Sequence, residues 1–192
     1  MNDRSSTKPL LQVDDLRVSL PTARGWAQAL RGVSWRMERG QTVGLIGESG
    51  SGKSLTALAL MGLLPERARV SGSIALQGQE LVGLAEPQMC QLRGARMAMI
   101  FQDPISCLDP SEEIGTQLEE AIPTSAFAGK FWQRFQWRKK RAIALLHRVG
   151  VKDHRKVMRA YPHELSDGMC QKVMIVARGS FSRMILGARA KW

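Results

Sequence analysis

Residues 47 to 54 combine the residue types that bind the phosphate groups of a nucleotide. The three glycines of this stretch let the backbone curl, so that several N–H groups can point inward at phosphate oxygens. Lys53 supplies a positive charge for the β- and γ-phosphates, and the Ser54 hydroxyl is placed to coordinate Mg²⁺. The alternative is an ordinary glycine-rich turn before a helix. The candidate phosphate-binding residues are Gly47, Glu48, Ser49, Gly50, Ser51, Gly52, Lys53 and Ser54.

The elements on either side of this stretch agree with phosphate binding. Residues 42–46, TVGLI, are a short apolar run bounded by glycine, which predicts a buried strand of a parallel sheet. Residues 52–61 have a helical pattern that Pro65 ends, and the start of that helix adds its positive dipole end to the cradle. A strand, this loop and a helix in succession form the Walker A pattern, which predicts binding of a nucleoside triphosphate with Mg²⁺. The pattern alone does not distinguish kinases, GTPases and transporter ATPases.

The other predicted elements describe an α/β protein with an antiparallel start and a helical insert. Alternating apolar residues indicate strands, and glycine or proline separates them from stretches of helical periodicity. We expect strands over 11–20, 33–37, 42–46 and 96–100, a hairpin over 70–81, and helices over 52–61, 86–93, 112–122, 131–149 and 153–159. No internal repeat interrupts this order.

Two further short sequences, MIFQDP and SDGM, follow the Walker A pattern along the chain, and both could contact a nucleotide or its metal ion. In MIFQDP, Gln102 follows a buried strand directly, where its amide could reach a metal ion or an attacking water. In SDGM, Ser166 is a good helix N-cap, and Gly168 leaves the backbone open to an anion. Each has an ordinary alternative, because glutamines often follow strands and Ser-Asp-Gly is a common turn. Their joint occurrence after a Walker A pattern favours the functional interpretation.

These motifs resemble those of the ATP-binding subunits of ABC transporters. The resemblance rests on GESGSGKS, on IFQDP and on residues 161–176, covers about residues 10–177, and is greatest with the branch that serves oligopeptide, dipeptide and nickel transporters. It implies a P-loop NTPase fold of the α/β class with an antiparallel β subdomain and a helical insert. The expected parts are residues 1–104 (antiparallel β and Walker A), 105–178 (helical subdomain with the signature helix) and 179–192 (a divergent tail). Gln102 would be the Q-loop residue that positions water and Mg²⁺.

The resemblance also implies partners and a location. Two ATP-binding subunits of this family pair head to tail, so Ser166 and Gly168 would contact the ATP held by the lysine of the partner subunit. The helical insert would dock on membrane-embedded permease subunits. The expected function is energy coupling in a transporter of peptides or polyamines, at the cytoplasmic face of the bacterial inner membrane.

Two positions depart from the family pattern. Asp167 replaces the usual first glycine of the signature, and its carboxylate favours the helix N-terminus but opposes a γ-phosphate. Adenine commonly stacks on an aromatic residue of an early strand in this family, but the corresponding position here is Leu20. Trp26 is nearby in sequence and is the candidate to replace it.

The net charge of +11 is concentrated in one segment. Residues 130–160 hold 11 of the 28 lysines and arginines and a single acidic residue. Such a segment could contact phosphate backbones, acidic membrane headgroups or an acidic protein, or be only a solvated helix face. Docking and anionic headgroups are the preferred interpretation, and no nucleic acid partner is expected. The alternative function is a P-loop protein that acts on nucleic acid through this basic segment.

The last 15 residues, RGSFSRMILGARAKW, contain no acidic side chain. The family continues from the signature into a buried strand with the Walker B aspartate and a catalytic glutamate, and later a switch histidine. We expect no counterpart of these here. His147, His154 and His163 all precede the signature, so none of them can be the switch histidine in chain order. The expectation is an incomplete core sheet, a truncated or frameshifted product, and no steady ATP turnover by this chain alone. A third option is a nucleotide-binding partner of an intact ATPase subunit.

Composition excludes other classes of protein. No apolar stretch approaches the length of a membrane span, and the polar start lacks the apolar core of a secretory signal. The cysteines Cys90, Cys107 and Cys170 are odd in number and widely spaced, which predicts neither disulfides nor a zinc site.

Overall fold

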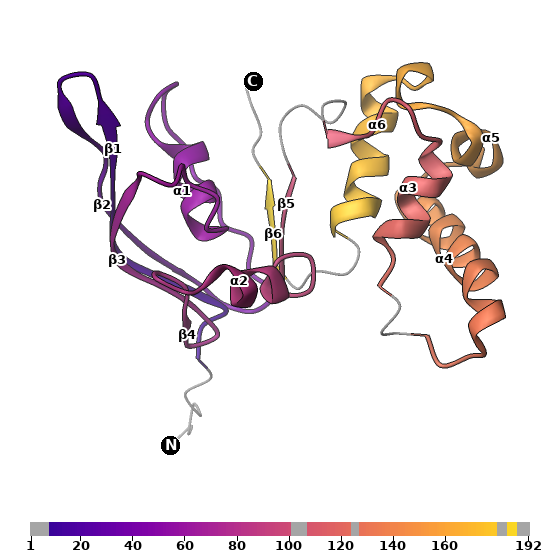
Figure 1. Cartoon of the computed structure of the whole chain (residues 1–192), viewed down its shortest axis with the longest axis horizontal. Coiled ribbons are helices and arrows are strands. Elements are labelled where there is room, and N and C mark those ends of the chain that lie inside the picture. Colours follow the sequence, from indigo (N-terminus) through magenta and orange to yellow (C-terminus); the bar gives the residue numbers. More distant parts are fainter. Residues whose placement is uncertain (1–7, 101–106, 124–126, 180–183, 188–192) are drawn as a thin grey trace. The chain divides into compact units, whose positions relative to one another are not determined.

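The computed structural model describes residues 8–100, 107–123, 127–179 and 184–187 (Figure 1). Two compact units divide the chain, residues 1–91 and residues 92–192. The first unit contains an antiparallel sheet and the helix that follows the glycine-rich loop. The second contains the helices of the expected insert and a pair of short strands. Gln102, the candidate for positioning water and metal, lies outside the described residues.

The sheet of the first unit has four antiparallel strands in the order β2-β1-β3-β4. Its strands are β1 (Leu11–Thr22), β2 (Gly25–Met37), β3 (Arg69–Leu76) and β4 (Gln79–Glu80). The alternating apolar residues of β1 form the buried face of the sheet, since Leu11, Val13, Leu16 and Val18 are all fully buried. The predicted strands and hairpin are therefore confirmed. The second strand is longer than predicted, since it begins at Gly25.

A bulge interrupts β1 at Asp14 and Asp15, where its pairing with β3 shifts register. Asp15 has a positive φ of 45°, its N–H donates to Ser34 Oγ at 2.8 Å, and its carboxylate binds Arg17. The Arg17 guanidinium lowers the pKa of Asp15. Gly72 faces the bulge with a φ of +93°, and a Cβ there would lie 2.6 Å from the Asp14 carbonyl oxygen. A side chain at position 72 would therefore push the bulge away from β3.

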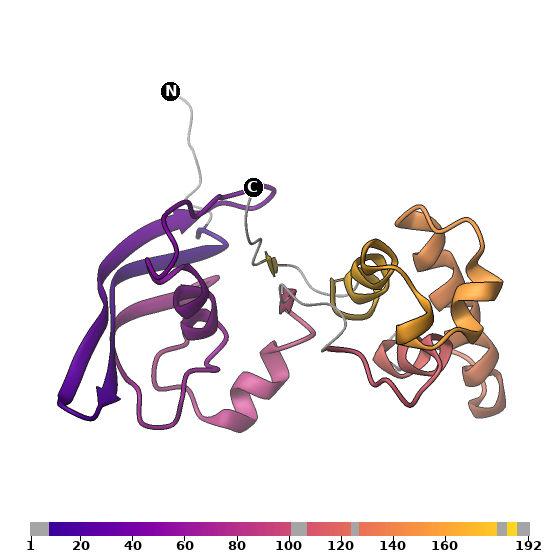
Figure 2. The same ribbon diagram turned by 90° about the horizontal axis from the view of Figure 1, so that it is seen from above.

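Helix α1 (Lys53–Leu60) packs against the concave side of this sheet, and Figure 2 shows β1 and β2 curving around it. Its buried residues are Thr56, Ala59 and Leu60. The prediction of a buried strand over residues 42–46 is wrong, since these residues form no strand and Ile46 is 99% exposed. An apolar run becomes a buried strand only where neighbouring strands take up its backbone hydrogen bonds. The described strands of the first unit pair only with one another.

Helices dominate the second unit, and most predicted helices are confirmed within a few residues. Helix α2 (Glu86–Leu92) ends at its border. The elements that follow are β5 (Met97–Ile100), α3 (Ile114–Ala121), the 3-10 helix η3 (Phe131–Gln133), α4 (Arg134–Arg148), α5 (His154–Arg159), the 3-10 helix η4 (Pro162–Glu164), α6 (Asp167–Met174), the π-helix η5 (Ile175–Gly179) and β6 (Met184–Gly187).

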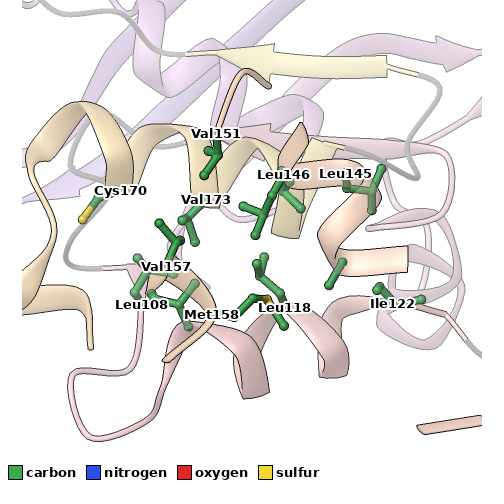
Figure 3. Close-up of a cluster of buried hydrophobic side chains, with 13 residues drawn as sticks. Leu108, Leu118, Ile122, Leu145, Leu146, Val151, Val157, Met158, Cys170 and Val173 are labelled. Carbon is green, nitrogen blue, oxygen red and sulfur yellow. The ribbon is translucent and has the colours of Figure 1, made fainter. Parts of the chain in front are cut away.

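Apolar side chains from these helices meet in one core (Figure 3). The close approach of α3 to α5 requires a small residue, since a Cβ at Gly115 would lie 2.5 Å from the Met158 carbonyl oxygen. The Ile114 N–H donates to the Ala160 carbonyl at 2.9 Å and ties the two helices together. The buried members of the core are Leu108, Ile114, Leu118, Ile122, Ala142, Leu145, Leu146, Val151, Val157, Met158, Cys170, Val173 and Val176.

A strand forms after α6, which corrects the expectation that this strand has no counterpart. Strand β6 pairs in parallel with β5, from Met97 opposite Met184 to Ile100 opposite Gly187. The sequence MIL supplies apolar residues for a short strand even though it resembles no family motif. Because parallel strands end at the same edge of a sheet, Ile100 at the end of β5 lies opposite Gly187 at the end of β6.

We predict that Gly72→Ala lowers the free energy of unfolding by more than about 2 kcal/mol, because it combines a positive φ with a steric clash at the bulge. Gly83→Ala is the matched control, since Gly83 has a φ of +78° but nothing within 4 Å of an added Cβ. The control should lose about 1 kcal/mol, from φ alone. Urea unfolding measures both, and equal losses would contradict the clash.

Candidate functional site

The glycine-rich loop adopts a conformation that only glycine tolerates at two of its positions. Gly50 has a φ of +82° and Gly52 a φ of +92°. A Cβ at Gly52 would also lie 2.5 Å from Leu30 Cδ2, and one at Gly47 would lie 2.7 Å from Ser51 Oγ. The Ser51 N–H donates to the Glu48 carbonyl at 3.2 Å and closes the turn. The loop is therefore a curled backbone in which a side chain at Gly47 or Gly52 would displace Ser51 or Leu30, and at Gly52 the positive φ adds strain.

Helix α1 begins directly at this loop with its N-terminal groups open to an anion. Gly52 is the N-cap, no side chain caps the helix among the described residues, and the first turn holds no acidic residue. Uncapped N–H groups and the positive end of the dipole favour a negatively charged ligand. Thr56, which the sequence analysis did not single out, donates its hydroxyl to the Gly52 carbonyl at 2.9 Å and fixes the join. The sequence could have indicated this role, because a threonine four residues after the helix N-cap can donate its hydroxyl to the N-cap carbonyl.

The Lys53 ammonium bridges the two ends of the loop. Its Nζ donates to the carbonyl oxygens of Gly47 at 2.7 Å and Glu48 at 2.6 Å, and to Ser51 Oγ at 3.3 Å. These three acceptors place one positive charge beside the curled backbone. The Ser54 hydroxyl, on the next residue of the helix, is exposed. The structure thus brings the predicted cation, the backbone N–H groups and the candidate Mg²⁺ ligand together in one short segment.

The signature sequence forms the start of α6, as predicted. Ser166 is the N-cap, and its Oγ accepts a hydrogen bond from the Met169 N–H at 3.4 Å. Ser166, Asp167 and Gly168 are all exposed, and nothing lies within 4 Å of a Cβ added at Gly168. The backbone at Gly168 is therefore open to a partner.

Cys170 anchors the same helix in the core. The side chain is fully buried, and its Sγ lies 3.6 Å from the Pro162 carbonyl oxygen, to which it donates. Burial raises the pKa of the Cys170 thiol, and the nearby negative charge of Asp167 raises it further. The thiol is therefore neutral and structural, in agreement with its interpretation from sequence.

Trp26 lies on the opposite face of the β1–β2 pair from the phosphate loop. Leu30, which contacts Gly52, pairs with Val18, whereas Trp26 pairs with Pro21. Successive side chains of β1 point to opposite faces, so Val18 and Leu20 share the loop side and Pro21 does not. The Trp26 ring instead carries the Arg69 guanidinium 3.8 Å from its centroid. The structure does not bring Trp26 to the phosphate loop.

No group of three or more His, Cys, Asp or Glu side chains that could hold a metal ion occurs among the described residues. His147 and His154 form a ring pair with centroids 4.5 Å apart, and His163 stacks on Tyr161 at 5.7 Å. Gln102 cannot be placed, because it lies outside the described residues.

Comparison with known proteins identifies relatives of this chain. The family model described as ABC transporter matches residues 30–183. The chain is 46% identical over 180 residues to the peptide transport system ATP-binding protein SapD of Salmonella typhimurium, covering 93% of this chain and 54% of SapD. It is also 46% identical over 168 residues to the oligopeptide transport ATP-binding protein OppD of Mycobacterium tuberculosis, covering 87% and 27%. The chain thus spans about half the length of the SapD relative that it matches.

Solved structures give the same fold. A dimeric bacterial ABC transporter cassette matches with a TM-score of 0.77 and 21% identity, covering 92% of this chain and 72% of the cassette. A cassette in a post-hydrolysis state, bound to ADP and Pi, matches with a TM-score of 0.75 and the same identity and coverage. At this identity the likeness concerns the fold alone, which is the α/β P-loop NTPase fold predicted from the sequence.

We predict that Ser166→Ala lowers the free energy of unfolding by about 1 kcal/mol, because α6 loses its N-cap acceptor. Ser166→Asp is the matched control and should keep stability within a few tenths of a kcal/mol, since aspartate caps equally well. Urea unfolding and the labelling rate of the buried Cys170 thiol measure the effect. A loss of stability that is the same in both variants would contradict the capping role.

Proposed function

The chain belongs to the ABC transporter family, and from this premise we propose that it is an ATP-binding, energy-coupling subunit of a peptide transporter. The identity of 46% to SapD and to OppD, both named for peptide transport, supports peptides as the cargo class. Polyamines are a second cargo in this proposal. The single observation that carries nucleotide binding is the loop over residues 47–54, in which the Lys53 ammonium and the open start of α1 lie together.

Each residue of the loop has a separate task in this proposal. The backbone N–H groups around Gly50 and Gly52 donate to phosphate oxygens, and the start of α1 adds its dipole. Lys53 exchanges its bonds with the Gly47 and Glu48 carbonyls for a phosphate oxygen, at short range because its ammonium is already beside the loop. Ser54 would contribute its hydroxyl to Mg²⁺, and Gln102 would bind the same ion or an attacking water. Bound ATP supplies the phosphates that join two subunits.

The second binding surface in the proposal is the start of α6. Ser166 and Gly168 are exposed and lie at a helix N-terminus, where an anion is favoured. A second ABC ATP-binding subunit placed head to tail would present its bound ATP to these two residues. The dimeric state of the matched cassette supports this arrangement.

Membrane attachment in the proposal is peripheral and depends on permease subunits. Among the described helices, none is long and apolar enough to cross a bilayer. Docking on membrane-embedded subunits would hold the chain at the cytoplasmic face of the bacterial inner membrane. The relative's name, ATP-binding protein of a peptide transport system, supports attachment to a transporter.

We predict that the chain binds labelled Mg-ATP and that Lys53→Ala weakens this binding by roughly 10- to 100-fold, the value of a lost hydrogen bond to a charged group. Lys152→Ala is the matched control, because Lys152 is an exposed cation of the other unit. Equilibrium binding with and without Mg²⁺ makes the measurement. Absent binding, or an equal loss in the control, would contradict the proposed function.

We also predict that Asp167→Asn strengthens ATP-dependent dimerisation by about fivefold, because one unit charge near a phosphate opposes it by about 1 kcal/mol in water at 4 Å. Asp153→Asn is the control, since Asp153 caps α5 and asparagine caps as well as aspartate. Sedimentation equilibrium with Mg-ATP measures the association. An unchanged dimer constant in Asp167→Asn would contradict this placement of the signature helix.

A further inference from the structure

Three aromatic side chains project from η3 and the first turn of α4 without a packing role. Phe131 is 77% exposed, Trp132 is 72% exposed and Phe135 is 67% exposed. The C-terminal half of α4 packs into the core of the second unit through Ala142, Leu145 and Leu146. Adjacent exposed rings of this size are uncommon on a soluble surface and indicate contact with another body.

The cations of the same segment lie directly beside these rings. Lys130 Nζ is 5.3 Å from the centroid of the Trp132 ring, and Arg134 Cζ is 5.0 Å from that of Phe131. Residues 130–141 hold six lysines and arginines and no acidic residue. We call this segment the aromatic–basic surface. Its apolar rings and its positive charges therefore face the same surroundings.

A groove of about 400 Å³ borders this surface and separates it from α3. Thr116, Glu119 and Glu120 form the α3 wall, and Arg138 lies on the other side. Burial raises the pKa of Glu119, while Lys139 and Arg138 oppose the rise. Arg138 Nε is buried without a hydrogen-bond partner in the part of the chain that the structure describes. The acidic groups are confined to α3, so an anion would approach from the α4 side.

We propose that the aromatic–basic surface, Lys130–Arg141, binds the surface of a bilayer that contains anionic phospholipid. Phe131, Trp132 and Phe135 enter the boundary between headgroups and acyl chains, where aromatic rings are favoured. The six cations contact the lipid phosphates. A bilayer fits better than nucleic acid, because bases would have to stack on the ring faces. Lys130 already covers one face of Trp132, and Arg134 already covers one face of Phe131.

This contact adds to the proposed function and does not depend on it. Attachment through permease subunits needs those subunits, whereas the aromatic–basic surface would give the chain its own affinity for the membrane. Nucleotide binding involves residues 47–54 of the other unit. The two proposals can therefore fail separately.

The test is co-sedimentation of the full chain with vesicles of phosphatidylcholine alone or with about a third phosphatidylglycerol. We expect binding to the anionic vesicles to be at least about tenfold tighter and to weaken with salt. Replacing Phe131, Trp132 and Phe135 with serine should weaken it at least about tenfold. Replacing Lys130, Lys139 and Lys140 with glutamine should do the same, since each cation near such a surface contributes a factor of about five.

The matched control replaces Lys152, Arg155 and Arg159 with glutamine, which removes the same charge from the exposed surface at and near α5. It should change vesicle binding by no more than about twofold. An equal loss in this control, or wild-type vesicle binding by the serine variant, overturns the proposal. So does a serine variant that binds vesicles normally but no longer binds purified permease subunits or single-stranded DNA.

Two measurements distinguish a failure of membrane binding from a failure of nucleotide binding and from misfolding of the variant. The serine variant should bind Mg-ATP and melt like the wild type, because the three rings are exposed. Lys53→Ala should bind anionic vesicles like the wild type. Loss of vesicle binding in Lys53→Ala would show that the surface is not independent of the phosphate loop and would overturn the proposal.

Discussion

A single ammonium group bonded to the carbonyls of the loop before it is the interaction on which the proposed phosphate site depends. Lys53 Nζ reaches Gly47 and Glu48 at 2.7 and 2.6 Å, which draws the loop around the start of α1. The sheet sets the position of that start, because Leu30 of β2 contacts Gly52. The Lys53 ammonium now donates to neutral carbonyl oxygens, and its hydrogen bond to a negatively charged phosphate oxygen would be stronger. The same geometry that stabilises the loop therefore prepares it for a ligand.

In the second unit, helix α6 has an exposed N-terminus and a buried middle. Cys170 and Val173 of α6 are fully buried, and one turn earlier Ser166 and Gly168 are exposed. The buried thiol stays neutral because burial raises its pKa. Helix α4 shows the same division in the same order along the chain, with an exposed aromatic–basic start and a buried end. Both exposed ends are available to partners because the core holds the other ends.

Local sequence patterns predicted most of this fold, and the errors have identifiable physical causes. The alternation of Leu11 to Val18 and the helical period of residues 131–149 each reflect a face that is buried within its own unit. Residues 42–46 carried the pattern of a buried strand but formed none, because burial depends on neighbours that the pattern does not contain. Strand β6 was missed for the converse reason, since its partner β5 lies more than 80 residues earlier. Trp26 was close to Leu20 in sequence, yet strand alternation turned it to the other face.

Backbone amide NMR of the labelled chain during titration with Mg-ATP tests the central claim most directly. The account predicts that the largest resonance shifts fall on residues 47–54, above all on Gly50, Gly52 and Lys53, whose amides would donate to phosphate oxygens. In Lys53→Ala the same shifts should need roughly 10- to 100-fold more nucleotide, while the remaining resonances stay in place. Shifts confined to other residues, or none at saturating nucleotide, would contradict the claim that this loop is a phosphate site.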